Sequence, residues 1–489
     1  MPLPTIPSGN VASALGGGYD VANSCRFNDD STDHLTRSQT AGDQRQGTFS
    51  AWVKRANLGY QYLISWNTTT SGTSLGDWIR FNGERLDVIR YTGSVIYRKQ
   101  TNRLFRDSSA WYHICVAFDS DQGTADNRIK IYVNGIQETS FETNTAPSQN
   151  LDFNFNSNGV VACIGRNYDT EANFDGYMSE VCWIDGTQNA VTDFGEFDED
   201  SPTIWKPKNV SGLTFGTNGF YLDLENSGSL GADVSGNGNN FTVNNLTSVD
   251  QSTDTPTLNY PVMNPLDALY PTTGSSSVFS EGNLQLQSGT GSNSSTGYSY
   301  NNATFALSAG KFYWEVKPTN LGGSSFIGII SEGQIYNQNL NEIANSVAYA
   351  WTIRENGNVR NNNANITCGS SYTTNDIIGV ALDLDNNKIY FSKNGDWSDG
   401  SGSWGSSTFN ASTGAITITA PASNRSGHYF PTVGASDYAH SSTFQLNFGS
   451  APYTISSGNA DGNGYGNFEY AVPSSFLAIN SYNLGTTGG

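Results

Sequence analysis

Charged residues are scarce in this sequence, and most of them are acidic. Asp, Glu, Lys and Arg make up 14% of the chain, and 44 acidic against 24 basic residues give a net charge of −20. Proteins that bind nucleic acid need Lys and Arg to neutralise phosphates, and an anionic membrane surface makes the same demand. The charge balance therefore argues against both, and it is compatible with neutral glycans, with basic protein partners, or simply with solubility.

Long apolar runs and helix signals are also missing. No stretch of about 18 apolar residues could span a membrane. No long window places apolar residues at helical spacing between capping residues. The first residues, MPLPTIPSGNVASALGGGYD, lack the basic and apolar regions of a secretory signal. We therefore expect no membrane insertion, and a protein working outside a cell would have to be released another way, such as by lysis as part of a particle.

The sequence contains few cysteines. Their number is odd, and their spacing does not match that of a metal-binding motif. Cys25, Cys115, Cys163 and Cys182 lie within apolar strand-like patterns, and Cys368 completes the five. Buried free thiols explain this arrangement better than a disulfide framework or a zinc site. The sequence thus indicates assembly in a reducing cytoplasm.

What the chain does contain is glycine, aromatic residues and repeated hairpin signals. IKIYVNG (129–135) and KIYFSKNG (388–395) are short alternating strands that run into Asn-Gly, the strongest short-range hairpin signal. Each comes after another strand-like segment, at 111–118 and 377–384. Two such units far apart predict an all-β chain with two antiparallel β-sandwich domains in tandem, and the family resemblances given below imply that these are jelly-rolls.

The spacing of strand-like and turn-rich segments divides the chain into five parts. We expect an N-terminal arm over residues 1–18, a β-sandwich over 19–206, an appendage or linker with short strands over 207–274, a second β-sandwich over 275–455, and a polar tail over 456–489. The one aromatic piece of the tail could be a strand exchanged with a neighbouring subunit.

The first sandwich resembles the laminin-G or concanavalin A-like jelly-roll family. The resemblance rests on four motifs in the family's order: FSAWVK (49–54), WYHICV (111–116), IYVNG (131–135) and DGYMSEV (175–181). Order and spacing agree over about 160 residues. The family is mostly one of binding domains, with a glycosidase branch.

The second sandwich resembles a SPRY domain, another binding fold. The motifs are GKFYWEV (310–316), DIIGVALD (376–383), KIYFSKNG (388–395) and YFPTV (429–433). The tandem of the two domains is similar to virion proteins of tailed phages, particularly marine ones.

The similarity to phage proteins implies a virion-surface protein assembled in the host cytoplasm with other virion proteins. A tail-fibre, tailspike or appendage subunit that binds host-surface glycans without cleaving them is the favoured interpretation. A capsid decoration or head-fibre structural protein is the alternative, and a glycan hydrolase is less favoured. A homo-oligomer is expected, a trimer as in many fibres, although no coiled-coil heptads support it directly.

No catalytic residue can be assigned from the sequence. The glycosidase branch carries Glu-x-Asp-x-x-Glu on one strand, which places two carboxylates beside the glycosidic bond. The closest text here is GEFDEDS (195–201), in which Ser201 stands where the third acid should be, so we interpret it as a solvated acidic turn. His113 alternates with apolar residues and is interpreted as a packed histidine rather than a base.

Calcium is the cofactor that the sequence could accommodate. The loop DSDQGTAD (119–126) gathers Asp119, Asp121 and Asp126, and Ca²⁺ takes six to eight oxygen ligands. Asp is also common in turns, so a polar hairpin loop without metal is the favoured interpretation. The loop at 233–239 is a similar candidate.

The segment NGDWSDGSGSWG (394–405) is the candidate glycan site. It is too polar to bury much, so we expect Trp397 and Trp404 to be exposed, where indoles stack on sugar rings or form subunit contacts. Asp399 would accept hydrogen bonds from hydroxyl groups, and Asn394 would shape the turn. By contrast, five tryptophans at strand positions are expected in the cores: Trp52, Trp66, Trp78, Trp314 and Trp351.

Overall fold

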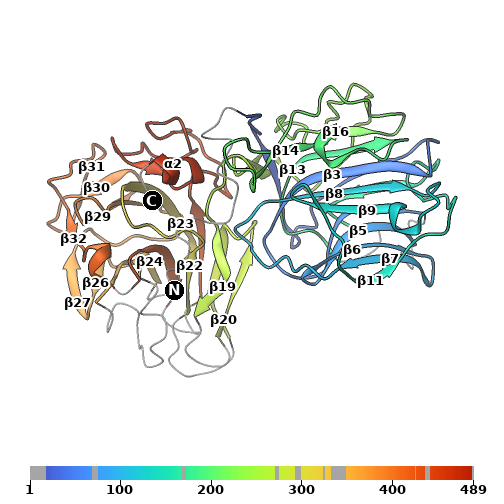
Figure 1. The fold of residues 1–489 in the computed structure, drawn as a ribbon. Coiled ribbons are helices and arrows are strands. Elements are labelled where there is room, and N and C mark those ends of the chain that lie inside the picture. Colours follow the sequence, from blue (N-terminus) through green and yellow to red (C-terminus); the bar gives the residue numbers. More distant parts are fainter. Residues whose placement is uncertain are drawn as a thin grey trace. The chain divides into compact units, whose positions relative to one another are not determined.

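The computed structural model of the 489-residue chain describes residues 18–68, 75–167, 172–269, 275–291, 299–322, 325–331, 348–424, 426–435 and 441–486. They form two compact units, one ending at Asn259 and the other beginning at Tyr260. We call these the first and second sandwich (Figure 1). The expected N-terminal arm, residues 1–18, lies outside the described residues except for Gly18.

The first sandwich consists of two antiparallel sheets and a short hairpin. In order across the first sheet, the strands are β10 (Ile136–Gln137), β9 (Ile129–Val133), β8 (Tyr112–Asp119), β3 (Gln46–Arg55), β13 (Gly176–Asp185), β1 (Ser24–Phe27) and β18 (Gln251–Ser252), with β16 (Phe220–Leu222) also paired to β13. The second sheet runs β11 (Phe141–Thr145), β7 (Val95–Thr101), β6 (Arg85–Tyr91), β5 (Gly76–Asn82), β4 (Gln61–Asn67), β12 (Val161–Ile164), β2 (His34–Ser38) and β17 (Thr242–Asn244). The hairpin pairs β14 (Gly195–Phe197) with β15 (Trp205–Pro207).

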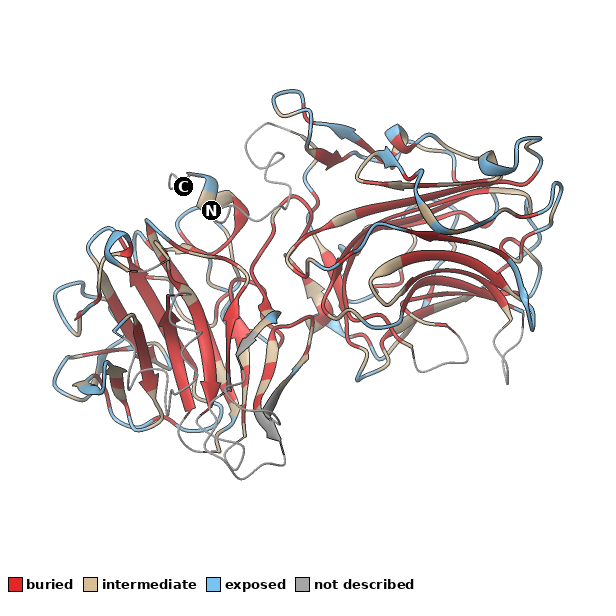
Figure 2. Cartoon of the chain, turned by 60° about the horizontal axis from the view of Figure 1, so that its bottom comes forward, coloured by how far each residue is buried: buried red, intermediate tan, exposed pale blue. Residues whose placement is uncertain are grey.

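Alternating side chains of both sheets fill the core of this sandwich. In β9 the buried Ile129, Ile131 and Val133 alternate with half-buried residues, as expected for a strand with one face on the core. The indoles of Trp66 and Trp183 lie 4.9 Å apart between the sheets. Buried residues run along the strands of each sheet (Figure 2).

Much of the segment expected as an appendage completes the first sandwich. β16 pairs with β13, β17 with β2 and β18 with β1, so residues beyond the β13 strand add to both sheets. The last part of the expected range, Met263–Leu269, forms strand β19 and belongs to the second sandwich.

The second sandwich also has two sheets. One runs β19 (Met263–Leu269), β22 (Ser299–Ala303), β33 (Phe430–Ala435), β24 (Ser325–Ile330), β25 (Ala350–Arg354), β26 (Asn358–Asn361) and β27 (Ala364–Thr367). The other runs β20 (Ser275–Ser280), β21 (Gln285–Gly291), β34 (Ser442–Asn447), β23 (Lys311–Asn320), β28 (Ile378–Asp383), β29 (Lys388–Lys393), β30 (Asp396–Ser398) and β31 (Trp404–Ser406); β32 (Ile416–Thr417) pairs with β29, and β35 (Leu477–Ala478) runs parallel to β23.

Helix is confined to short pieces in the described residues: η1 (Ala125–Asn127), η2 (Val191–Asp193), η3 (Ser248–Asp250), η6 (Pro421–Ser423) and α2 (Ser481–Thr486). The predicted all-β class with two jelly-roll-like domains is confirmed.

In this single-chain structure the C-terminal tail packs on its own chain, where the ring of Phe468 lies 5.2 Å from that of Tyr313 of β23. Glu315 of β23 faces away from the core and is fully buried beneath the tail. Its carboxylate accepts hydrogen bonds from the backbone N–H groups of Glu469 (3.0 Å) and Tyr470 (2.8 Å). A buried carboxylate requires such donors, and the tail supplies them.

Both Asn-Gly hairpins have the predicted turn. The φ angles are 48° and 77° at Asn134 and Gly135, and 51° and 86° at Asn394 and Gly395, as a type I′ turn requires. In each hairpin the Asn side chain also accepts a hydrogen bond, at 2.8 Å, from a backbone N–H of the preceding strand segment. The two hairpins are therefore anchored in the same way.

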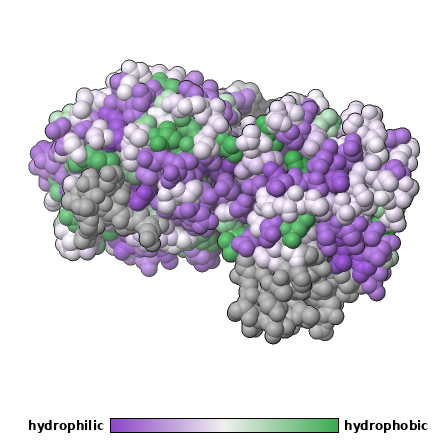
Figure 3. Space-filling view, turned by 180° about the vertical axis from the view of Figure 1, so that it is seen from behind, coloured by the Kyte–Doolittle hydropathy of each residue, from purple (hydrophilic) through white to green (hydrophobic). Residues whose placement is uncertain are grey.

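The other expectations about buried residues are also confirmed. All five cysteines are buried and free. The five tryptophans expected in the cores are at most 6% exposed. On the face shown in Figure 3, apolar residues form small separate patches among hydrophilic ones. Among the described residues, we find no helix with the length and apolar character needed to cross a membrane.

Candidate functional site

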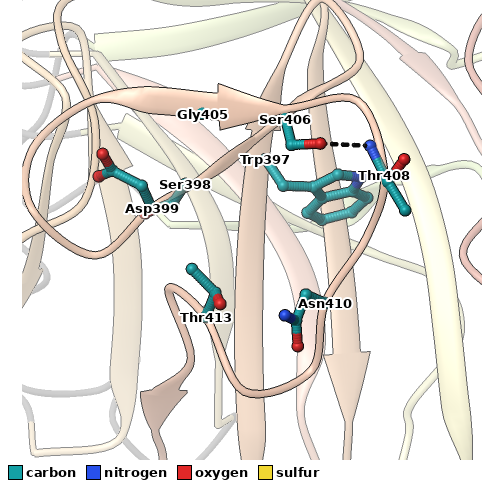
Figure 4. Close-up of a pocket in the computed structure, with 8 residues that line it drawn as sticks. All are labelled: Trp397, Ser398, Asp399, Gly405, Ser406, Thr408, Asn410 and Thr413. Carbon is teal, nitrogen blue, oxygen red and sulfur yellow. Dashed lines mark hydrogen bonds between the residues drawn. The ribbon is translucent and has the colours of Figure 1, made fainter.

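A pocket of about 310 Å³ opens at the β31 edge of the larger sheet of the second sandwich. This volume is within the range of small-molecule sites. The lining residues are Trp397, Ser398, Asp399, Gly405, Ser406, Thr408, Asn410 and Thr413 (Figure 4).

Trp397 forms one wall of the pocket but is not the exposed loop residue that the sequence predicted. Its side chain is only 7% exposed, and its indole packs 5.0 Å from the ring of Phe409 and 6.3 Å from that of Tyr313. The prediction was wrong because the two-residue turn returns the chain at once into β30, where Trp397 pairs with Ser392. Strand pairing holds the indole against its neighbours.

Asp399 lies at the rim of the pocket and is partly exposed. Its carboxylate accepts hydrogen bonds from the backbone N–H and hydroxyl of Ser401, both at 2.7 Å, and from the N–H of Ser403 at 3.1 Å. These hydrogen bonds hold the pKa of Asp399 below its ordinary value. The group is therefore ionised near neutral pH and acts as an acceptor.

The other two predicted residues do not line the pocket. Trp404 of β31 is half-buried, and its indole Nε1 donates to the Ser370 carbonyl at 2.9 Å. Asn394 lies in the hairpin turn, and its side chain donates to Asp376, in the segment before β28, at 2.6 Å. The structure thus brings together two of the four candidates, Trp397 and Asp399.

Sequence reasoning missed the polar side of the pocket. Ser406 ends β31, and Thr408, Asn410 and Thr413 come from the loop after it. Figure 4 shows the Trp397 indole flanked by Ser406 and Thr408 on one side and Asn410 on the other. In a chain so rich in Ser, Thr and Asn, no local signal marked these residues.

The lining combines an aromatic wall, hydroxyl and amide groups, and one carboxylate. Hydroxyls and amides both donate and accept hydrogen bonds, and the carboxylate accepts them. None of the eight lining residues is cationic. Such a surface suits a neutral, polyhydroxylated ligand and offers no counterion to an anionic one.

The three candidate calcium ligands do not converge. Asp119 is buried and accepts a hydrogen bond from the N–H of Asp121. Asp121 faces Arg45 at 3.3 Å, and Asp126 faces Lys99 at 3.6 Å. Within the part of the chain that the structure describes, no three His, Cys, Asp or Glu side chains form a metal-binding group. The geometry matches a polar hairpin loop.

The second calcium candidate, at residues 233–239, is likewise organised by hydrogen bonds within the chain. The Asp233 carboxylate accepts from the backbone N–H groups of Tyr221 and Asn239, and from the N–H and hydroxyl of Ser235. Its oxygens are thus engaged in holding the turn.

The acidic segment at 195–201 forms a turn that is solvated only in part, because its first three residues pair as β14 and Asp198 is buried. Asp198 accepts hydrogen bonds from the N–H groups of Asp200 and Ser201 and so closes the turn. Glu196 is exposed beside it.

His113 is a packed core histidine, as interpreted. It is fully buried, and burial lowers its pKa to about 3. Its Nδ1 accepts from the indole Nε1 of Trp205 at 3.1 Å, so its proton resides on Nε2, 2.8 Å from the Ser50 hydroxyl. The ring holds two strands and the β15 segment together.

Two β-sandwiches in tandem define the class of this protein: an all-β chain built from two antiparallel sandwich domains. Residues 29–190 match the Laminin_G_3 family of the concanavalin A-like lectin/glucanases superfamily, and residues 311–451 match the SPRY domain family. The chain therefore carries a concanavalin A-like Laminin_G_3 domain and, after it, a SPRY domain, and both domain resemblances are confirmed.

Solved structures similar to parts of the chain include the SPRY domain of human HERC1 (18% identity, TM-score 0.26, 38% of this chain and 96% of that one). A Bacteroides ovatus protein described as carbohydrate-binding shares 17% identity, with a TM-score of 0.31, over 46% of this chain and 59% of that one. A heptameric SAP-like pentraxin from Limulus polyphemus shares 18% identity, with a TM-score of 0.26, over 36% and 82%. No curated protein matches the chain significantly.

Proposed function

We propose that this protein binds neutral glycans of a host-cell surface, without cleaving them, as a tail-fibre, tailspike or other appendage subunit on the surface of a phage particle. The carbohydrate-binding part of this proposal rests on the pocket beside β30. Its aromatic wall, its hydroxyl and amide groups and its ionised rim carboxylate are the groups that recognise a sugar.

The Laminin_G_3 match supports the same role, since the superfamily is described by its lectins and glucanases. The similarity of the domain tandem to tailed-phage virion proteins supports the location. Other virion proteins and further copies of this chain, in a trimer, are the partners that this location implies.

Incubation of the purified protein with polysaccharide from the host surface tests the function. We expect retention of the polysaccharide with its chain length unchanged. Shortened chains would show a hydrolase instead. No retention, together with labelling of the capsid rather than the tail by electron microscopy, would favour the decoration protein.

A pair of variants tests the pocket itself. Thr408→Val with Thr413→Val removes two hydroxyls from the lining and keeps the side-chain shape. If each hydroxyl makes one net hydrogen bond worth about 1 kcal/mol, the affinity for the glycan falls at least about 10-fold. Thr417→Val, on the exposed face of β32, is the matched control and should bind normally.

A further inference from the structure

Lys54, Asp254 and Asn259 form a buried cluster in the first sandwich, and none of them lines the pocket of the proposed function. The Lys54 ammonium donates to the Asp254 carboxylate at 2.7 Å and to the Asn259 side-chain carbonyl at 2.8 Å. The relative exposures of the three residues are 0%, 2% and 1%. A lysine, a carboxylate and a primary amide are thus in contact away from bulk water.

Local structure brings the three groups together. Successive side chains of β3 point to opposite faces of the sheet. Because Val53 points into the core, Lys54 lies on the outer face. Thr255 and Leu258 exchange backbone hydrogen bonds across a tight turn with Pro256 as its second residue.

Asp254 and Asn259 flank that turn, at the next opposed position. Side chains directly opposite one another in a hairpin lie on the same face, so both point toward Lys54. The Ser24 hydroxyl fixes the Asp254 backbone by donating to its carbonyl at 2.6 Å, and the Asn259 amide donates to the Ser109 carbonyl at 2.8 Å.

Aromatic rings enclose the cluster. Tyr177, the cross-strand partner of Lys54, has its ring centre 5.7 Å from the ammonium. The indole of Trp111 donates to the second oxygen of Asp254 at 3.0 Å and lies 6.3 Å from the Tyr177 ring. Burial in these surroundings lowers the pKa of Lys54, which makes its neutral, nucleophilic form more accessible.

We propose that Lys54 and Asn259 become joined by an intramolecular isopeptide bond, with Asp254 as the general acid and base. Asp254 accepts a proton from the Lys54 ammonium, and the neutral Nζ attacks the side-chain carbon Cγ of Asn259. The new C–N bond forms, Asp254 returns the proton to Nδ2, and the bond from Cγ to Nδ2 breaks.

The reaction balances without a co-reactant. The second proton that Nζ loses leaves with the departing nitrogen as an ammonium ion. Lys54 retains one hydrogen as the N–H of the new amide, and Asp254 ends as a carboxylate. No oxidant, metal or energy source is consumed.

The bond would join the last residue of the first sandwich to its strand β3. Asn259 is the last residue of the first unit, directly before the second unit begins. A pull along the chain at this point would load the central strand β3 through a covalent bond rather than through the short strand β18. Such a closure suits a chain under mechanical load, and it is independent of glycan binding.

The intact mass of the purified, denatured protein tests this inference. We expect a mass lower than that of the sequence by one ammonia, and a single digestion product that joins the peptides of Lys54 and Asn259. An unmodified mass would overturn the proposal, and so would an ammonia loss with both peptides found separately, as succinimide formation at an Asn-Gly site would give.

Variants identify the reacting groups. Lys54→Arg and Asp254→Asn should both carry the full mass and lack the joined peptide. Lys99→Arg is the matched control, because Lys99 is also buried and faces an aspartate, Asp126, whose side chain is exposed. This variant should retain the bond; a joined peptide that persists in Asp254→Asn would contradict the role of Asp254.

Discussion

The two sandwiches build the same anchored Asn-Gly hairpin and then use it differently. In the first, Trp205 covers Gly135 so closely that a Cβ there would overlap its ring, and the same indole stacks on buried His113. In the second, Tyr470 of the tail covers Gly395 in the same way, but the chain continues into β30 and β31 and leaves the pocket beside Trp397 open. The difference lies in the segments added after the hairpin, and these are where we propose that the function resides.

Two buried carboxylates, Asp254 of the first sandwich and Glu315 of the second, have different partners. Asp254 in the first is paired with the cation Lys54. Glu315 in the second is held by neutral donors: two backbone N–H groups, the Tyr313 hydroxyl and the Asn447 amide. Burial therefore raises the pKa of Glu315 to about 7, although these hydrogen bonds oppose the shift.

The largest expected effect is on the core of the second sandwich. Trp314 lies with Phe312 on the buried inner face of β23, opposite Val380, as the two-residue period predicts. Trp314→Ala should lower the free energy of unfolding by about 3–5 kcal/mol, the cost of deleting a buried indole. Chemical denaturation measures it, and an unchanged midpoint would place Trp314 at the surface.

The next effect is a pH dependence that Glu315 gives to the second sandwich. Its pKa in the folded state is about 7, above the ordinary 4.5, so the folded state holds the proton more tightly. The contribution of Glu315 to the free energy of unfolding is fully present below pH 4.5 and is lost as the pH rises toward 7. At 1.36 kcal/mol per pKa unit, the loss is about 3 kcal/mol.

Urea titrations of the wild type and Glu315→Gln at pH 5 and pH 8 measure this contribution. In the variant, the free energy of unfolding should no longer fall with pH by the amount that Glu315 contributes. The variant should also be less stable at both pH values, because its amide N–H₂ faces N–H donors. Burial also raises the pKa of Glu180, in the first sandwich, to about 7. Glu180→Gln is therefore the variant to compare with Glu315→Gln. Equal pH slopes in the wild type and Glu315→Gln would contradict the account.

A smaller effect distinguishes the two tryptophans near the pocket. Trp404→Ala loses one hydrogen bond to Ser370 and a half-buried ring, so we expect a loss of about 1 kcal/mol. Trp397→Ala should cost more, because its indole is buried against Phe409. Thermal unfolding of both variants checks the order, and the reverse order would show that Trp397 is the exposed residue after all.

The smallest expected effect is that of calcium on the first sandwich. Because Asp121 and Asp126 face their own cations, a strong chelator should leave the Tm unchanged. A Tm that falls in chelator, recovers with added calcium, and no longer responds in Asp121→Asn would restore the metal site.

The sequence predicted those parts of the fold in which side-chain pattern and turn chemistry agree. Strands β9 and β29 lie within the two segments predicted to run into Asn-Gly, because alternating apolar residues end there at a clear turn. Strands such as β21 and β22 were missed, since their Ser, Gln, Gly and Asn residues resemble the loops of this chain.

The site was predicted only in part, for a related reason. Asp399 was named as a candidate and lines the pocket, where its Asp-Gly-Ser context forms a turn. The burial of Trp397 depends on Phe409, which a later loop brings over it. Likewise, Lys54 and Asn259 lie about 200 residues apart in sequence, and no local pattern in either segment indicates that they touch.

Hydrogen–deuterium exchange on the protein with and without the host polysaccharide tests the glycan-binding pocket most directly. We predict that residues 396–414, which span β30, β31 and the loop after them, become protected when the polysaccharide is added, and that the Thr408→Val, Thr413→Val variant loses this protection. Protection confined to the first sandwich, or none at a concentration at which the polysaccharide is retained, would contradict the account.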